Sequence, residues 1–244
     1  MKLREKMNKD IKGYIFDFGG TLDTGGCHWG KFIWHSYERN AVPVDWESFR
    51  EAYVYAEREL GKGDIIRCEH TFHDTLAIKL RLQMDYLRGH GALKREEVDV
   101  PATCDLLLDD VYMAARKQIE ESKDVLAVLS RRVPLVLVSN FYGNLPTVIH
   151  EMGLDGCFQK VVESAAVGIR KPDPRIFSLA LSDLGLPGSD VVVVGDSLKN
   201  DILPADSLGC QTVWLKGEGW NNDSYLPPSQ TRVVASLSEL TDDI

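Results

Sequence analysis

The sequence contains no long hydrophobic run and no surplus of basic residues, and both absences narrow its function. Its longest apolar stretches, such as Pro134–Val138 and Val191–Val194, are far shorter than the roughly 20 residues needed to cross a bilayer. The first apolar run contains Asp17 and two glycines, which argues against a signal peptide. Lys and Arg number 28 against 37 Asp and Glu, a formal net charge of −9. Nucleic acids and anionic membranes are bound by clustered Lys and Arg, so we expect neither as a partner.

Cysteine patterns of the kinds that hold metals or staple small folds are also missing. The five cysteines form no C-x-x-C pair, and their spacing suits neither a zinc site nor a disulfide framework. We therefore expect free thiols and a cytoplasmic protein. The 244 residues, 44 % of them hydrophobic and 27 % charged, suffice for one large domain or a core with a smaller second domain.

The order of the apolar segments predicts an α/β fold. A short apolar run at 13–16 ends at an acid and two glycines, as a buried strand ending in a turn does. From about 27 to 115 the hydrophobic period is helical, and after 120 short apolar strands alternate with helices. Such alternation is typical of a parallel sheet covered on both faces. The predicted domains are a doubly wound, Rossmann-like core (residues 1–24 and 116–244) and an inserted helical cap (25–115).

The pattern also predicts the individual elements. Helices are expected over 45–60, 70–88, 104–120, 122–132, 144–152, 173–184 and 199–208, and later strands over 135–138, 158–162, 191–194 and 212–215.

Polar residues follow three of the predicted strands where each strand ends. Asp17 follows the first strand, Ser139 and Asn140 the second, and Asp196 the fourth. Ligands of open α/β sheets bind at the carboxyl ends of the strands, so we expect these side chains to converge. Lys171, at the start of the helix after the third strand, can reach the same place.

The residue types at this edge favour phosphoryl chemistry. Carboxylates such as Asp17, Asp196 and Asp201 repel one another around one point unless a cation lies between them, and oxygen ligands suit Mg²⁺. A carboxylate can also act as a nucleophile that forms an aspartyl-phosphate. A lysine and a serine hydroxyl would hold phosphoryl oxygens and offset charge in the transition state.

Four motifs, taken in order, resemble those of the haloacid dehalogenase-like (HAD) hydrolase superfamily in its helical-cap branch. They are DFGGT at 17–21, a hydrophobic strand ending in Ser139, Lys171 within RKPDP, and GDSLKND at 195–201. The resemblance covers nearly the whole chain, including the cap. It implies a hydrolase, most of all a Mg²⁺-dependent phosphatase that acts on a small phosphorylated metabolite through an aspartyl-phosphate.

The resemblance further implies the role of each motif residue at the metal. Asp17 would be both nucleophile and metal ligand, and Asp196 a second ligand. Asp201 would bind the metal or its water, and Gly19 would contribute its backbone carbonyl.

The remaining motif residues are implied to hold the substrate. Ser139 and Lys171 would bind the phosphoryl group, and Lys171 would also position the acids. Thr21 would support the loop that follows the nucleophile. The predicted substrate-binding residues, in the site or in the cap loop after Gly61, are Gly20, Thr21, Lys62, Arg67 and Asn140.

One position departs from the family pattern. The phosphatases carry a second Asp two residues after the nucleophile, as general acid and then base, whereas this chain has Gly19. Dehalogenase and phosphonatase members also lack this acid, but the dehalogenases do not keep a full metal set such as Asp196 and Asp201. The retained set therefore favours metal-dependent phosphoryl or phosphonyl chemistry, with Asp23 and His28 as candidate replacement acids.

Two alternatives stay open at this point. A phosphonatase-like C–P hydrolase would need a Schiff-base lysine in the cap, for which Lys62 is the candidate. A catalytically weak regulatory protein would bind Mg²⁺ and phosphate without turnover. The sequence determines neither the substrate nor the oligomeric state.

Overall fold

The structure, a computed structural model, describes residues 11–63, 65–93, 98–220 and 226–241. It divides into two compact units, which we call the core unit and the helical unit. The core unit is drawn from residues 1–28, 118–141 and 154–244, and the helical unit from 29–117 and 142–153.

These boundaries, at 28/29 and 117/118, lie a few residues after the sequence-based ones at 24/25 and 115/116, and there is one larger difference. The segment 142–153 belongs to the helical unit, although its place between two core strands predicts that it lies in the core. It contains helix α5 (Leu145–Glu151). Its Asn144 donates through the side-chain amide to the Thr75 hydroxyl at 2.8 Å, so this segment packs against the helical unit.

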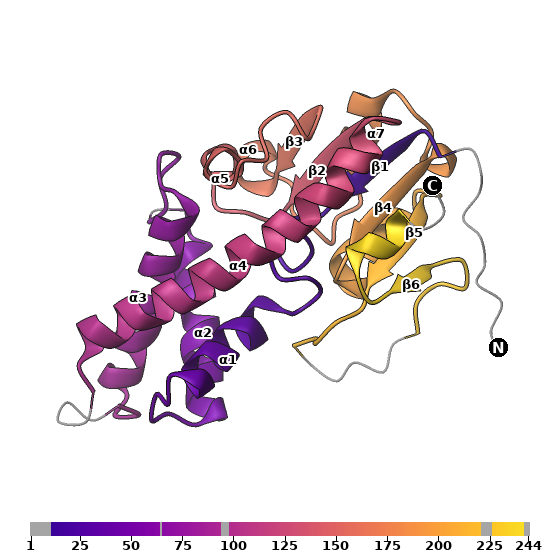
Figure 1. The fold of residues 1–244 in the computed structure, drawn as a ribbon. Helices are drawn as coiled ribbons and strands as arrows, with labels where there is room; N and C mark the ends of the chain where they lie inside the picture. Colours follow the sequence, from indigo (N-terminus) through magenta and orange to yellow (C-terminus); the bar gives the residue numbers. More distant parts are fainter. Residues whose placement is uncertain (1–10, 64, 94–97, 221–225, 242–244) are drawn as a thin grey trace. The chain divides into compact units, whose positions relative to one another are not determined.

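The core unit contains a six-stranded sheet in the order β3-β2-β1-β4-β5-β6, in which every pair is parallel (Figure 1). The predicted doubly wound parallel sheet is therefore confirmed. The last strand, β6, has only three residues and was not predicted, because so short a segment shows no measurable period. The strands are β1 (Gly13–Phe16), β2 (Leu135–Ser139), β3 (Lys160–Glu163), β4 (Val191–Gly195), β5 (Gln211–Leu215) and β6 (Arg232–Val234).

Helices follow the strands in the core unit and make up most of the helical unit. The core has α6 (Ser164–Val167), η1 (Gly188–Asp190), α7 (Arg175–Leu184), the π-turn η2 (Leu198–Ile202), α8 (Leu203–Asp206) and η3 (Leu237–Leu240). The helical unit has α1 (Trp29–Arg39), α2 (Trp46–Leu60), α3 (Phe72–Gly89) and α5, and α4 (Val100–Ser130) contributes to both units.

Helix α4 runs unbroken where the pattern predicts two helices separated near residue 121. No Gly or Pro interrupts residues 102–130, so nothing in the chain ends the helix there. Ser122 is accommodated because its hydroxyl bonds to the Gln118 carbonyl one turn earlier (3.1 Å) and to the Leu22 carbonyl (2.8 Å).

The central strands are apolar throughout because both faces of the sheet are covered. Ile15 and Val193 lie in one buried cluster with Phe177 of α7. Tyr14 and Phe16 alternate with Ile15, which turns them to the opposite face, where their rings stack 5.9 Å apart. Fully burying a side chain of this size contributes roughly 1.5–3 kcal/mol. This packing fixes β1, and with it the residue that follows, at the middle of the sheet.

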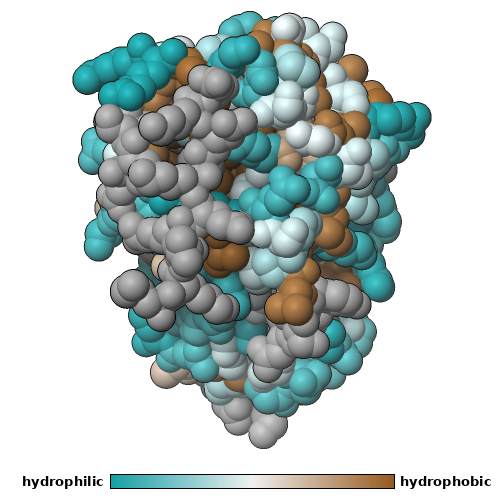
Figure 2. Space-filling view, turned by 90° about the vertical axis from the view of Figure 1, so that its right-hand side faces the viewer, coloured by the Kyte–Doolittle hydropathy of each residue, from teal (hydrophilic) through white to brown (hydrophobic). Residues whose placement is uncertain are grey.

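No helix in the described part of the chain is long and apolar enough to span a membrane. On the face drawn in Figure 2, hydrophobic residues show as small patches between hydrophilic ones.

The helical unit holds a buried ion pair between α2 and α3. Lys79 is 6 % exposed, and its Nζ lies 2.7 Å from Oε1 of Glu57, whose other oxygen accepts the Tyr142 hydroxyl at 2.8 Å. The ammonium also faces the rings of Trp29 and Tyr142 at 5.6 and 5.5 Å. Burial lowers the pKa of Lys79, but the Glu57 charge outweighs it and holds the pKa above its usual value. Lys79 is therefore a permanent cation.

Removing the charge of Glu57 should lower the free energy of unfolding more than removing the charge of Lys79. Glu57→Gln leaves a buried ammonium without its counter-charge and should lower the free energy of unfolding by about 3 kcal/mol. Lys79→Met should lower it less, because the Glu57 side chain is 30 % exposed and can be hydrated. Urea unfolding of both variants tests this, and a larger loss in Lys79→Met would contradict it.

Candidate active site

The carboxylate of Asp17 lies at the carboxyl end of β1, where it is 5 % exposed. Its backbone N–H donates to the Val194 carbonyl of β4 at 3.0 Å, which continues the pairing of the two central strands. One carboxylate oxygen accepts from Lys171 Nζ and the other from the Thr21 hydroxyl at 3.0 Å. The side chain is thus fixed in place by a cation on one side and a hydroxyl on the other.

Lys171 is the only lysine of the described chain that bridges two of these acids. Its Nζ donates to Asp17, to Asp201 at 2.7 Å and to the Val138 carbonyl at 3.2 Å. Its backbone is held by Asn140, whose amide accepts from Lys171 N at 2.9 Å and donates to Lys171 O at 3.1 Å. Burial lowers the pKa of Lys171, but Asp17 and Asp201 outweigh it and raise the pKa above its usual value.

Asp17, Asp196 and Asp201 form a carboxylate cluster. One oxygen from each lies within 4.8 Å of the others. Burial and the charges of Asp17 and Asp201 raise the pKa of Asp196 well above its usual range. Burial likewise raises the pKa of Asp201 to about 6, although Lys171 opposes the shift.

This donor set fits a hard divalent cation. Two buried carboxylates and the partly exposed Asp196 lie around a single ammonium, and burial together with repulsion between the acids raises the pKa of Asp196 and of Asp201. Oxygen-only ligands suit Mg²⁺. A cation between these oxygens would remove the repulsion.

The loop after Asp17 is shaped by a glycine and a buried acid. Gly20 has φ +99°, and a Cβ built there would lie 2.6 Å from the Asp196 carboxylate. Its N–H donates to Asp23 Oδ1 at 2.7 Å, and its carbonyl accepts from Gly26 N at 2.7 Å. Asp23 is fully buried, so its carboxylate serves this turn from inside the protein.

Sequence reasoning missed two further residues at this edge of the sheet. Trp214 of β5 donates through its indole N–H to the Asp196 carbonyl at 2.7 Å. Glu163, the last residue of β3, is 4 % exposed and pairs in register with Ser139, itself 1 % exposed. An acid at a strand end is a usable sequence signal for Glu163. No signal distinguishes Trp214 from an ordinary strand aromatic.

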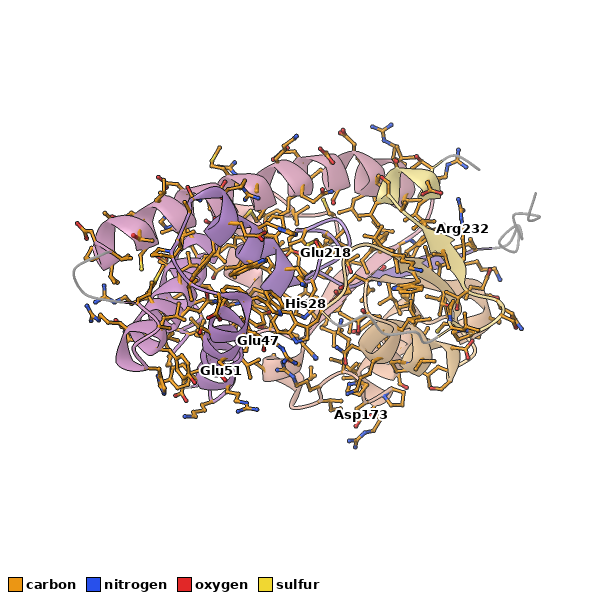
Figure 3. All side chains as sticks on the ribbon, turned by 90° about the horizontal axis from the view of Figure 1, so that it is seen from below. His28, Glu47, Glu51, Asp173, Glu218 and Arg232 are labelled. Carbon is orange, nitrogen blue, oxygen red and sulfur yellow. The ribbon has the colours of Figure 1, made fainter. Side chains whose placement is uncertain are left out.

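A second loop packs on the one that follows Asp17. The His28 N–H donates to the Glu218 carbonyl at 2.8 Å, and both residues are labelled in Figure 3. The His28 ring lies 4.9 Å from that of Trp220. A Cβ at Gly217 would lie 2.4 Å from the carbonyl oxygen of Gly26, so the two backbones touch.

The predicted cap contacts, Lys62 and Arg67, are exposed residues of the helical unit. Lys62 forms an ion pair with Glu59 at 2.6 Å, and its side chain is 58 % exposed. Their contact with a substrate stays a prediction.

Gly20 and Gly19 should differ sharply in their tolerance of a side chain. Gly20→Ala should lower the free energy of unfolding by about 1–2 kcal/mol, because φ +99° is strained for alanine and the methyl group meets Asp196. The φ of Gly19 lies outside the left-handed region, so Gly19→Ala should leave stability unchanged or slightly higher. Urea unfolding of the two variants checks this, and equal losses would contradict it.

Comparison with known proteins agrees with this arrangement. Residues 11–209 match a family model described as haloacid dehalogenase-like hydrolase. Haloacid dehalogenase-like hydrolase domain-containing protein 3 from Danio rerio is 34 % identical over 147 residues, which span 57 % of this chain and 60 % of that protein. The Danio rerio phospholysine phosphohistidine inorganic pyrophosphate phosphatase is 27 % identical over 259 residues, 97 % of this chain and 92 % of its own.

The fold is likewise that of solved structures. The crystal structure of a dehalogenase superposes with a TM-score of 0.62 at 20 % identity, over 97 % of this chain and 98 % of that one. A family model that matches most of the chain, together with the parallel sheet and its strand-end acids, leads to one conclusion. The chain belongs to the haloacid dehalogenase-like hydrolases and is a hydrolytic enzyme.

Proposed function

We propose that this hydrolase is a Mg²⁺-dependent phosphatase that acts on a small phosphorylated metabolite through an aspartyl-phosphate intermediate. The observation that carries the proposal is the Asp17 carboxylate, held between Lys171 and Thr21 beside two further acids, Asp196 and Asp201. The relative that aligns over 97 % of the chain is itself named as a phosphatase, which supports the same reaction class.

Each residue of the site has a separate role in the proposed reaction. Asp17 attacks phosphorus, and its bond to the Lys171 ammonium holds the carboxylate in position for the attack. Ser139, the last residue of the neighbouring strand, would bind a phosphoryl oxygen. Asp17, Asp196 and Asp201 would hold Mg²⁺, which supplies positive charge to the phosphoryl group when bound. Water then cleaves the aspartyl-phosphate and restores Asp17.

The C–P hydrolase alternative is less favoured by the lysines of the helical unit. A Schiff-base lysine must lose its proton before it attacks a carbonyl. Lys62 is an exposed residue paired with Glu59, and Lys79 is kept cationic by Glu57. Neither environment favours a neutral amine. A regulatory protein would bind Mg²⁺ and phosphate without releasing phosphate from a substrate, so a measurement of phosphate release distinguishes it from a phosphatase.

Asp17→Asn should abolish phosphate release and leave the protein folded. Asn has nearly the same shape but is a poor nucleophile, so kcat should fall at least about a hundredfold. Phosphate release from a panel of phosphometabolites with Mg²⁺ measures this. The matched control is Asp173→Asn, which changes a partly exposed aspartate of the core unit paired with Arg175 and should retain wild-type activity. Activity above a few per cent in folded Asp17→Asn would refute the covalent mechanism.

Removal of divalent cations should stop turnover, and Mg²⁺ should restore it. Mg²⁺ should also raise the unfolding temperature of the wild type, because an ion that binds only the folded protein stabilises it. Asp196→Asn should lose both effects, since it removes one of the three clustered carboxylates. Calorimetric titration with Mg²⁺ gives a readout that is independent of activity. Full turnover in excess EDTA would exclude the metal site.

A further inference from the structure

We infer, on the basis of the proposed phosphatase function, that the substrate carries a leaving group that departs as a stable anion. The substrate class is then an acyl phosphate or a phosphoanhydride rather than the phosphate ester of an alkyl alcohol. The inference depends on which proton donors the core unit presents beside Asp17.

In the loop that begins at Asp17 (residues 17–24), the one partly exposed residue is a glycine, which has no side chain. Of residues 17–24, only Gly19 is partly exposed, and the other seven are buried. A substrate that reaches Asp17 therefore meets this loop at Gly19. A glycine offers it backbone atoms and no acid.

The protons of the Lys171 and Thr21 side chains are already committed. The three N–H bonds of the Lys171 ammonium match its three acceptors, Asp17, Asp201 and the Val138 carbonyl. The single hydroxyl proton of Thr21 faces the carboxylates of Asp17 and Asp196 at 3.0 and 3.3 Å. A leaving group would have to compete with charged acceptors for any of these protons.

Three possible proton donors of the core unit remain, the candidate replacement acids Asp23 and His28 and the strand-end acid Glu163. Asp23 is fully buried, and its carboxylate accepts the N–H of Gly20. Glu163 ends β3, which is two strands from β1 and therefore roughly 10 Å away across the sheet. His28 packs its ring against Trp220. Of these three, only His28 is partly exposed, and the experiment below tests it directly.

The first chemical step then selects the leaving group. Asp17 Oδ forms a bond to phosphorus while the bond from phosphorus to the leaving oxygen breaks, and the electron pair stays on that oxygen. From an acyl phosphate the product is a carboxylate, and from a phosphoanhydride a phosphate, both stable without added protons. From an alkyl phosphate it is an alkoxide, which needs a proton in the transition state, and general acid catalysis of that kind is worth roughly 10²–10⁴ in rate.

The second step places no such demand on the enzyme. The aspartyl-phosphate is itself an acyl phosphate, so its leaving group is the Asp17 carboxylate. Water adds to phosphorus, the bond to Asp17 breaks, and the proton lost by the water passes to a phosphate oxygen or to solvent. The products are inorganic phosphate and the original carboxylate.

A leaving-group series tests the inference. The substrates are acetyl phosphate, pyrophosphate, phenyl phosphate and ethyl phosphate, and kcat/KM is measured with Mg²⁺ under conditions where cleavage limits the rate. Wild type should favour acetyl phosphate and pyrophosphate over ethyl phosphate by at least about a hundredfold. Because acyl phosphates are also intrinsically more reactive, two matched variants isolate the enzyme's share. Gly19→Asp should raise the rate with ethyl phosphate selectively, whereas Gly19→Asn, equal in size but not an acid, should not.

The outcomes separate this inference from the proposed function. A wild-type series that is flat and still depends on Asp17 would overturn the substrate class and leave the phosphatase intact. Selective loss of ethyl phosphate cleavage in His28→Gln would also overturn it, by identifying His28 as the donor. Equal rate ratios in folded Gly19→Asp and Gly19→Asn would count against it as well. No turnover of any phosphate, or turnover unaffected by Asp17→Asn, would instead refute the phosphatase. The wild-type series needs no variant, so a flat series overturns the inference even where a substitution prevents folding.

Discussion

The ammonium group of Lys171 joins parts of the chain that are far apart in sequence, and the site depends on it. It connects Asp17 after β1, the Val138 carbonyl of β2 and Asp201 after β4 through three hydrogen bonds. A buried charge pair is weak evidence for stability, but loss of one partner leaves the other charge unpaired in the interior, at a cost of several kcal/mol. The Asn140 amide bonds to both the N–H and the carbonyl of Lys171, so the lysine side chain extends toward the two acids from a fixed backbone. The same contacts therefore close the carboxyl edge of the sheet and hold the nucleophile.

This edge of the sheet also brings like charges close together in a partly buried place. Asp196 and Asp201 are held close to Asp17 although burial and mutual repulsion raise the pKa of both. Lys171 restrains Asp201, and neutral groups restrain Asp196. Trp214 donates to the Asp196 carbonyl, and Gly20 allows the loop to pass against the Asp196 carboxylate where any side chain would collide. The protein thus uses backbone geometry to hold charges together that would otherwise separate, as expected of a site built for a charged ligand.

Much of this could be predicted because it follows from local chemistry repeated at equivalent places. An apolar run that stops at an acid gives both a parallel strand and the side chain at its carboxyl end, so Asp17, Asp196 and their neighbourhood follow from the pattern. The two hydrogen bonds from Asn140 to the Lys171 backbone could not be predicted, because a residue that pairs with a lysine backbone looks in sequence like one that binds substrate. The continuity of α4 was hidden by Ser122, whose hydroxyl bonds within the helix. The segment 142–153 follows a core strand in sequence, and only tertiary packing through residues such as Asn144 assigns it to the helical unit.

The position of β1 has a consequence for the order in which the protein is assembled. This strand is made first, yet it lies at the centre of the sheet and pairs Tyr14 with Leu135 on one side and with Val192 on the other. Both partners are distant in the chain, so closing these loops requires a large loss of chain entropy before any contact compensates for it, and such topologies fold slowly. During synthesis β1 has no strand to pair with until β2 leaves the ribosome. The four-residue length of β1 keeps that unpaired apolar segment short, which limits the surface on which nascent chains would aggregate.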